Sequence, residues 1–210
     1  MKLYFIRHGR QDSPLCNVDV PLCEAGRRQA ELLGVRLEQY GIDALYSSNL
    51  IRAVQTAEII NEHLHIKHTI IPELQEISFG ALEGMREEDI QTQYKDFLTE
   101  RRQMKSDLAY PEGENGQMVY ERAYPVIQSI LQTDAQRIAI VTHGGLIRAV
   151  LAGLLGMDMA KKLMFAKELE NTSITQIDYH EEYEYFTVER INDYAHIEQQ
   201  EQLLRKYFIR

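Results

Sequence analysis

The chain has 210 residues, 44% of them hydrophobic, and a formal net charge of −9. This length and composition fit one buried core, so we expect a single domain over residues 1–210. The negative charge argues against a general attraction to nucleic acid or to an anionic membrane, and any affinity for phosphate must come from locally gathered arginines. We therefore expect a small partner.

The sequence has no segment typical of a signal peptide or of a membrane-spanning helix. The first apolar run meets Arg7 after six residues, and the longest apolar stretch, 149–157, is too short to cross a bilayer. Two cysteines, Cys16 and Cys23, are too few for a disulfide framework, and we expect free thiols in a reducing compartment. These features predict a cytoplasmic protein without membrane contact.

In the first third of the chain, the sequence pattern predicts the order strand, polar turn and helix two times. An apolar run indicates a buried strand, and Gly9 marks the turn that leaves it. A polar loop over 10–20 follows, and after the second strand a polar turn leads into a helix with Arg52 in its first turn, where anions are favoured. The predicted elements are strand 3–6, helix 24–40, strand 44–46 and helix 50–64.

The middle of the chain predicts a strand at 68–71, an ordered loop at 74–84 and one or two surface helices within 86–104. The loop contains two glycines and two candidate acids, Glu76 and Glu83. The simplest interpretation of the charged run 86–104 is a solvated face. Three alternating histidines have no Cys or carboxylate at matching spacing, so we interpret them as surface residues rather than metal ligands. They are His63, His65 and His68.

The clearest buried strand is 138–141, which ends at His143 and is followed by an apolar helix. An amphipathic helix over 119–131 precedes it, and we expect Pro125 to kink or limit that helix. Two paired strands, 173–178 and 185–191, are predicted with a hairpin at 180–184, and the tail from His196 has a helical pattern.

Alternating strands and helices predict an α/β fold, a three-layer αβα sandwich with a mostly parallel sheet. In this layout His8 and His143 both leave strands at their carboxyl ends, where ligands bind in open α/β sheets. Arg7 and Arg52 can reach the same point, and helix amino ends favour an anion there. Since Gly144 lets the backbone approach closely, these residues predict a cage for a phosphate dianion.

Such a cage can also perform chemistry. A neutral imidazole aimed at phosphorus is a competent nucleophile, and surrounding positive charge lowers its pKa, which suits His8 to this task. The leaving group needs a proton, and the residues alone leave Glu76 and Glu83 both open as its source. No metal ion or cofactor is expected, because arginines and imidazoles spread the charge of the phosphoryl-transfer transition state.

Five motifs in this order resemble those of the histidine phosphatase superfamily, specifically its phosphoglycerate mutase-like branch. The resemblance implies that His8 is phosphorylated during turnover and that Arg7, Arg52 and His143 bind the transferred phosphoryl group. It also implies that Glu76, four residues before the first glycine of its loop, is the catalytic glutamate, with Glu83 structural. The motifs are 5–9 (FIRHG), 21–26 (PLCEAG), 47–57 (SSNLIRAVQTA), 74–84 (LQEISFGALEG) and 141–145 (VTHGG).

The chain departs from this family in three places. The loop after the first motif is shorter than usual and begins Arg10-Gln11 where Glu followed by Ser or Thr is common, which leaves Asn17 as a candidate substrate-loop residue. Cys23 replaces the usual Ser or Thr, and we interpret it as a cap substitute. The long insertion of mutases is missing after the glutamate loop, and 171–174 resembles the phosphatase pattern, so hydrolysis is favoured.

The sequence therefore predicts a histidine acid phosphatase-type phosphomonoesterase that needs no metal, with His8 as nucleophile and Glu76 as general acid and base. The alternatives are a phosphoglycerate mutase or bisphosphatase, and a non-catalytic phosphate-binding module. We expect a small phosphorylated metabolite as partner, with a phosphoprotein as the alternative, and specificity in the loops 10–20 and 84–116. The tail offers apolar residues to the body or to an oligomer, namely Leu203, Leu204, Phe208 and Ile209.

Overall fold

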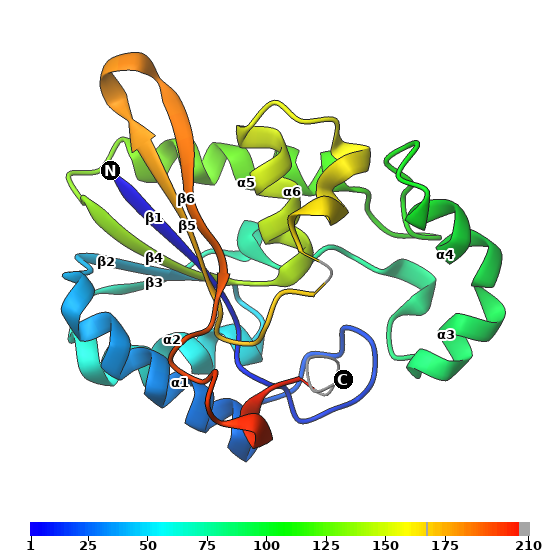
Figure 1. Ribbon diagram of the computed structural model, residues 1–210, viewed down its shortest axis with the longest axis horizontal. Helices are drawn as coiled ribbons and strands as arrows, with labels where there is room; N and C mark the ends of the chain where they lie inside the picture. Colours follow the sequence, from blue (N-terminus) through cyan, green and yellow to red (C-terminus); the bar gives the residue numbers. More distant parts are fainter. Residues whose placement is uncertain (167, 206–210) are drawn as a thin grey trace.

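The computed structural model describes residues 1–166 and 168–205. The strands of this part of the chain are β1 (Lys2–Arg7), β2 (Ala44–Ser47), β3 (His68–Ile70), β4 (Arg137–Thr142), β5 (Ile174–His180) and β6 (Tyr185–Asp193). They form one sheet in the order β3-β2-β4-β1-β5-β6 (Figure 1). The pairs from β3 to β1 are parallel, whereas β5 runs antiparallel to both β1 and β6. The sheet is therefore mostly parallel, as predicted.

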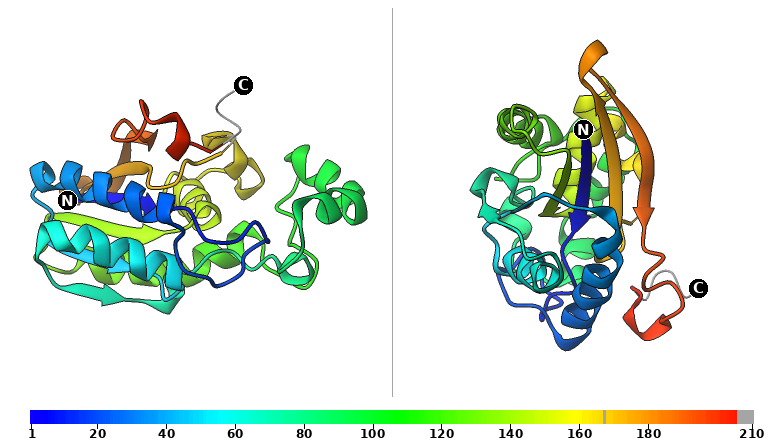
Figure 2. Two further views of the ribbon diagram at one scale, coloured as in Figure 1. Left: turned by 90° about the horizontal axis from the view of Figure 1, so that it is seen from below. Right: turned by 90° about the vertical axis from the view of Figure 1, so that its left-hand side faces the viewer.

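Two layers of helices cover this sheet. The helices are α1 (Glu24–Leu37), α2 (Ile51–Leu64), α3 (Glu87–Gln93), α4 (Lys95–Arg102), α5 (Gly116–Leu131) and α6 (Gly144–Leu154). Side chains of a strand alternate between its faces, so Leu3 and Phe5 of β1 pack with α5 and α6, while Tyr4 and Ile6 pack with α1 and α2. Figures 1 and 2 show the two helix pairs on opposite sides of the sheet. This arrangement confirms the three-layer αβα sandwich.

The helices follow some of the predicted start and stop signals and depart from two of them. α1 continues as a short 3₁₀ turn and stops at Gly41, whose φ of 61° is the left-handed conformation that glycine adopts without strain. Cys23 precedes α1 without a side-chain capping bond, so its interpretation as a cap substitute is wrong. Pro125, expected to kink or limit its helix, lies inside the unbroken span of α5. Pro125 and Glu121, the residue whose carbonyl loses its helical donor, are both exposed, where water can bind that carbonyl.

The remaining segments gather at the edge toward which the parallel strands run. α3 and α4 form an arm beyond this edge, at the right of Figure 1. The end of the described chain returns to the loop 10–20, where Arg10 donates to the carbonyls of Leu203 at 2.6 Å and Leu204 at 2.8 Å. Over residues 196–205, the tail forms a 3₁₀ turn, Glu201–Leu203, instead of the predicted helix. Its apolar Leu203 is buried, whereas Phe208 and Ile209 lie outside the described residues.

Both cysteines are free thiols. Across residues 1–166 and 168–205, no helix is both long and apolar enough to span a membrane.

Candidate active site

The two predicted histidines meet where neighbouring strands end. β1 and β4 pair in parallel with Arg7 opposite Thr142, so His8 and His143 follow at the same edge of the sheet. Their ring centroids lie 5.0 Å apart. Arg52 joins them from the first turn of α2, with a side chain that is only 2% exposed. The structure thus brings together four residues that the sequence placed in one cage.

The bonds around His8 define its tautomer. Nδ1 lies 2.7 Å from the carbonyl of Gly9, which can only accept, so Nδ1 carries the hydrogen and Nε2 keeps a lone pair. Arg52 donates from Nε to that Nε2 at 3.3 Å. Burial, followed by the charges of Arg52 and Arg7, lowers the pKa of His8 well below its ordinary value. The imidazole is therefore neutral at physiological pH.

Side chains that sequence reasoning did not assign fix the backbone around His8. Asn171 donates to the carbonyl of His8 at 2.9 Å, and the amide of Gly9 donates to Thr56 at 3.0 Å. Thr56 lies within the motif 47–57 and Asn171 within the segment 171–174, so a polar side chain inside these segments was the available signal. They hold the main chain of His8 and Gly9 from two separate elements.

His143 lies deeper than His8 and is fully buried. The hydroxyl of Ser48 lies 2.7 Å from its Nε2, while Nδ1 is buried without a hydrogen-bond partner among the described residues. Burial, followed by the charges of Arg52 and His8, lowers the pKa of His143 well below its ordinary value. A neutral ring with a free nitrogen is suited to a ligand oxygen that reaches it past His8.

The two arginines differ in what they hold. Arg7 donates to the carbonyl of Leu169, and its Nε is buried without a partner in the described chain. Burial lowers the pKa of Arg7 to about 9. Arg52 donates to the carbonyl of Val18 at 3.0 Å and to Oδ1 of Asn17 at 2.8 Å. The short loop 10–20 is thereby tied to the cage, and Asn17 contacts it through Arg52.

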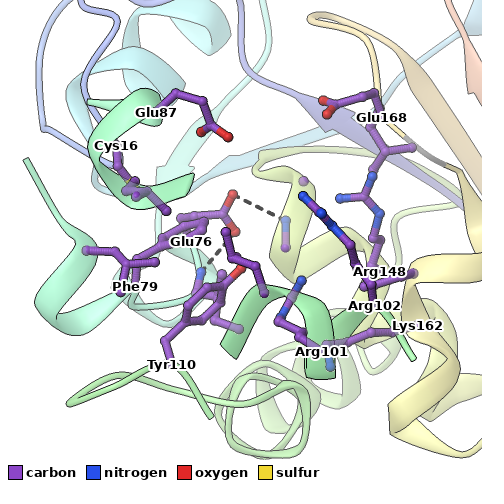
Figure 3. Close-up of a pocket in the computed structure, with 18 of the residues that line it drawn as sticks. Cys16, Glu76, Phe79, Glu87, Arg101, Arg102, Tyr110, Arg148, Lys162 and Glu168 are labelled. Atoms are coloured by element: carbon purple, nitrogen blue, oxygen red, sulfur yellow. Dashed lines mark hydrogen bonds between the residues drawn. The ribbon is translucent and has the colours of Figure 1, made fainter. Parts of the chain in front are cut away.

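The structure separates the two candidate acids. Glu76 accepts from the amides of Ile77 at 2.9 Å, Leu146 at 3.1 Å and Gly145 at 3.2 Å, so its carboxylate lies at the amino end of α6 (Figure 3). Glu83 instead binds the turn of its own loop. It accepts from the Phe79 amide at 2.9 Å, the Ser78 hydroxyl at 3.2 Å and the Asn17 amide at 3.0 Å. Only Glu76 faces the cavities of the site.

The two glycines after His143 differ in the space around them. A Cβ on Gly144 would have its nearest neighbour at 3.7 Å, an ordinary contact. A Cβ on Gly145 would lie 2.5 Å from Oε1 of Glu76 and 2.5 Å from Ile77. Gly144 lines a cavity, but the close approach that requires glycine is that of Glu76 to Gly145.

Two cavities meet at this site, and both are lined by Arg7, Cys16, Glu76 and Phe79. The His8 cavity, about 530 Å³, also contains His8, Arg52, Asn17 and Arg205. The α4 cavity, about 620 Å³, lies on the other side of Glu76. Its further lining includes Arg101, Arg102, Tyr110, Gly144, Arg148 and Lys162.

The charged run 86–104 is not wholly a solvated face, contrary to the simplest interpretation of its sequence. The guanidinium of Arg101 lies 4.8 Å from the ring centroid of Tyr110, and its Nε is buried. Arg148, on α6, lines the same cavity. Its position four residues after Gly144 places it on the same helix face, which is a signal that the sequence did offer.

The three alternating histidines do not converge. His63 lies 2.8 Å from Glu38, and His68 lies 2.8 Å from the hydroxyl of Ser47. His65 is exposed. In the part of the chain that the structure describes, no cluster of three or more His, Cys, Asp or Glu side chains could hold a metal ion.

Comparison with known proteins gives this site a family. The model of the histidine phosphatase superfamily (branch 1) matches residues 3–194. The uncharacterized phosphatase PhoE of Bacillus subtilis (strain 168) is 31% identical over 183 residues, covering 84% of this chain and 88% of its own. The probable phosphoglycerate mutase GpmB of Yersinia pestis (strain Pestoides F) is 28% identical over 210 residues, covering 94% and 95%.

Solved structures agree in fold. A mycobacterial glucosyl-3-phosphoglycerate phosphatase in complex with VO3 superposes with a TM-score of 0.83 at 25% identity, covering 91% of this chain and 99% of that one. The sheet, the helix layers and the ordered motifs therefore agree with a phosphoglycerate mutase-like α/β fold. The chain belongs to the histidine phosphatase superfamily and is a histidine phosphatase-type enzyme.

Proposed function

We propose that this protein hydrolyses phosphomonoesters through a phosphohistidine intermediate on His8, without a metal ion or another cofactor. The observation that carries the proposal is the neutral His8, whose Nδ1–H is bonded to Gly9 and whose Nε2 lone pair faces Arg52. A nitrogen with a free lone pair beside two buried guanidinium groups suits attack on a phosphate dianion. Arg7, Arg52 and His143, with Gly144 at the start of α6, then bind the transferred phosphoryl group.

The reaction has two steps. Nε2 of His8 attacks phosphorus, the ester P–O bond breaks, and Glu76 gives its proton to the leaving oxygen. Glu76 then takes a proton from water, which attacks the phosphohistidine and releases inorganic phosphate. The amides of Gly145 and Leu146 hold the carboxyl group of Glu76 in place at the amino end of α6.

Hydrolysis of a small metabolite is favoured over mutase activity. The chain lacks the long insertion expected of mutases after the glutamate loop, and cavities of about 530 and 620 Å³ fit small ligands. We also propose that residues 1–210 form a single domain, supported by one continuous sheet and a family match over 3–194.

The test is rapid-quench analysis with a ³²P-labelled phosphomonoester. Wild-type protein is expected to yield acid-labile, base-stable label on protein and to release phosphate, with no effect of added chelator. His8→Ala is expected to do neither. A matched control is His65→Asn, at an exposed helix end where φ is 53°, a conformation that Asn tolerates.

Two results would redirect the proposal. If wild-type protein binds phosphate but never becomes labelled, it is a binding module. If 3-phosphoglycerate with a bisphosphoglycerate primer gives isomer rather than free phosphate, it is a mutase.

A further inference from the structure

The α4 cavity continues the site beyond Glu76, on the side away from His8. Glu76 borders both cavities, whereas His8 lines only the smaller one. In-line attack by His8 places the leaving oxygen opposite its Nε2 and beside the proton donor. The part of the substrate attached to that oxygen is therefore directed into the α4 cavity.

This cavity has one strongly basic side. Among the described residues, five cationic side chains line it against three acidic ones, in a protein whose net charge is −9. The cations are Arg7, Arg101, Arg102, Arg148 and Lys162, and the acids are Glu76, Glu87 and Glu168. Figure 3 shows Arg101, Arg102, Arg148 and Lys162 on one side of Glu76, with Cys16, Phe79 and Tyr110 on the other.

Contacts within the protein neutralise only part of this charge. Lys162 is paired with Asp107, and Glu168 is paired with Arg205 at 2.9 Å. The oxygens of Glu76 are occupied by backbone amides. Arg101 forms no ion pair with any described residue, and its Nε is buried without a hydrogen-bond partner.

Arg101 is held in place although no described residue provides it with a counter-ion. Its guanidinium packs against Tyr110, whose ring lies 4.6 Å from that of Phe79 and 5.5 Å from that of Phe97. Burial lowers the pKa of Arg148, and the charge of Arg101 adds to the lowering. Two cations within electrostatic range of each other, one of them unpaired, are stabilised by an anion placed between them.

The opposite wall is apolar and aromatic. It consists of Ile77, Phe79, Leu82, Ile90, Leu98 and Tyr110. A ligand that fills a space of about 620 Å³ can place a hydrocarbon or ring against this wall while an acidic group reaches the arginines.

We propose that the α4 cavity is a second-anion subsite, in which Arg101 and Arg148 bind a carboxylate or phosphate carried by the leaving group. The inference rests on the proposed hydrolysis and names its substrate class. That class is a phosphomonoester whose alcohol portion has an apolar or aromatic body and ends in a second acidic group.

The test compares three aryl phosphates that share a scaffold: 4-carboxyphenyl phosphate, 4-phosphonophenyl phosphate and the neutral 4-carbamoylphenyl phosphate. For each anionic ester, kcat/KM is divided by that of the carbamoyl ester. The intrinsic reactivity of each ester is the same for every protein variant. A change in this ratio between variants therefore reports binding of the second anion alone. We expect Arg101→Gln to lower the ratio about tenfold or more, as for loss of a charged hydrogen bond. The ratio for Arg101→Lys is expected to lie between the ratios of the wild-type protein and of Arg101→Gln.

Arg86→Gln is the matched control. Arg86 is an exposed arginine of the same arm, paired with Glu88 at 3.4 Å, and it does not line the cavity. Its variant should keep the wild-type ratio. A preference for the carboxylate or for the phosphonate identifies the kind of second anion.

Two outcomes would overturn the inference and can be told apart. Hydrolysis of all three esters with a ratio that Arg101→Gln leaves unchanged rejects the subsite while the proposed function stands. Absence of both hydrolysis and a labelled phosphoenzyme with every ester rejects the proposed function, and the subsite with it. Thermal melting of Arg101→Gln shows whether the variant is folded, and the carbamoyl ester supplies its internal reference.

Discussion

Arg52 directs its Nε–H at Nε2 of His8, 3.3 Å away, while its other nitrogens hold Val18 and Asn17. One guanidinium therefore faces the proposed nucleophile and fixes the loop 10–20 at the same time. When a substrate phosphoryl group binds, it must accept the hydrogen bond from Nε of Arg52 in place of His8, while the other nitrogens of Arg52 keep their bonds to the loop. This requires a planar, forked donor, which lysine cannot replace.

The first prediction concerns this fork. Arg52→Lys keeps the charge but cannot contact His8, Val18 and Asn17 together, and we expect kcat/KM to fall about 100-fold, as when one donor to a transition state is lost. Steady-state kinetics on a phosphomonoester measures the effect. The exposed Arg28, paired with Glu31 on α1, gives the control Arg28→Lys. A loss no larger than in this control would contradict the assigned role of Arg52.

The second prediction separates the two glutamates by leaving group. Glu76→Gln removes the proton donor, so kcat/KM for an alkyl phosphate should fall by about 100- to 10,000-fold. The loss should be much smaller with 4-nitrophenyl phosphate, whose phenolate leaves without a proton. Glu83→Gln disturbs only the loop that Glu83 holds and should affect both substrates by the same factor. Equal losses with both substrates in Glu76→Gln would remove Glu76 as the acid.

The third prediction uses neighbouring glycines. Gly145→Ala would push Glu76 and Ile77 from contacts of 2.5 Å, and we expect a stability loss of about 1 to 3 kcal/mol with a fall in kcat/KM. Gly144→Ala meets nothing closer than 3.7 Å and should melt at or above the wild-type temperature. Thermal melting and steady-state kinetics of the two variants measure these effects. Similar melting of the two variants would contradict the packing of Glu76 against α6.

The fourth prediction is a loss of stability in mild acid. Burial, followed by the charge of Arg36, lowers the pKa of His196 to about 4, against an opposing effect of Asp193. Since the unfolded histidine binds its proton near its ordinary pKa of about 6.5, the folded state loses stability as pH falls from there to about 4. The pKa values of His8 and His143 are lowered in the same direction.

Urea unfolding at about pH 7 and about pH 5 measures this effect, and we expect the free energy of unfolding to drop by about 1 to 2 kcal/mol or more. His196→Gln should reduce the drop, because it removes one group that must be kept neutral. His65→Asn, at an exposed position, should leave it unchanged. A free energy of unfolding that rises toward pH 5 would show that these histidines are not held neutral.

Periodicity and turn residues were sufficient to predict most of the fold. The run around Phe5 alternates between two apolar cores, and Gly41 ends α1 where its conformation requires glycine. Pro125 does not limit its helix: it lies on an exposed face together with Glu121, the residue whose carbonyl loses its donor, and sequence alone does not show this exposure. The tail was misjudged because its backbone carbonyls bind Arg10 instead of continuing a helix.

Residues at strand ends were predictable, since parallel strands carry their carboxyl ends to one edge; hence the convergence of His8 and His143. Side chains that reach this edge from other elements could not be predicted in this way. Thr56 and Asn171 act on the backbone of the His8 segment across long sequence separations, and Arg101 enters from a run whose charge suggested solvent. Local patterns mark Thr56 and Asn171 as polar residues in or beside motifs, but the contact that each side chain makes depends on how distant segments fold back.

The start of α6 connects the proposed acid to the rest of the cage. His143 is the residue directly before this helix, and the next amides hold Glu76, which otherwise belongs to a loop. A fluctuation that released Glu76 would also strip two helix amides of their acceptor, so the loop and the helix end open together or stay closed together. The acid thus has the rigidity of a helix terminus, and local opening of this region inactivates the site in a single cooperative event.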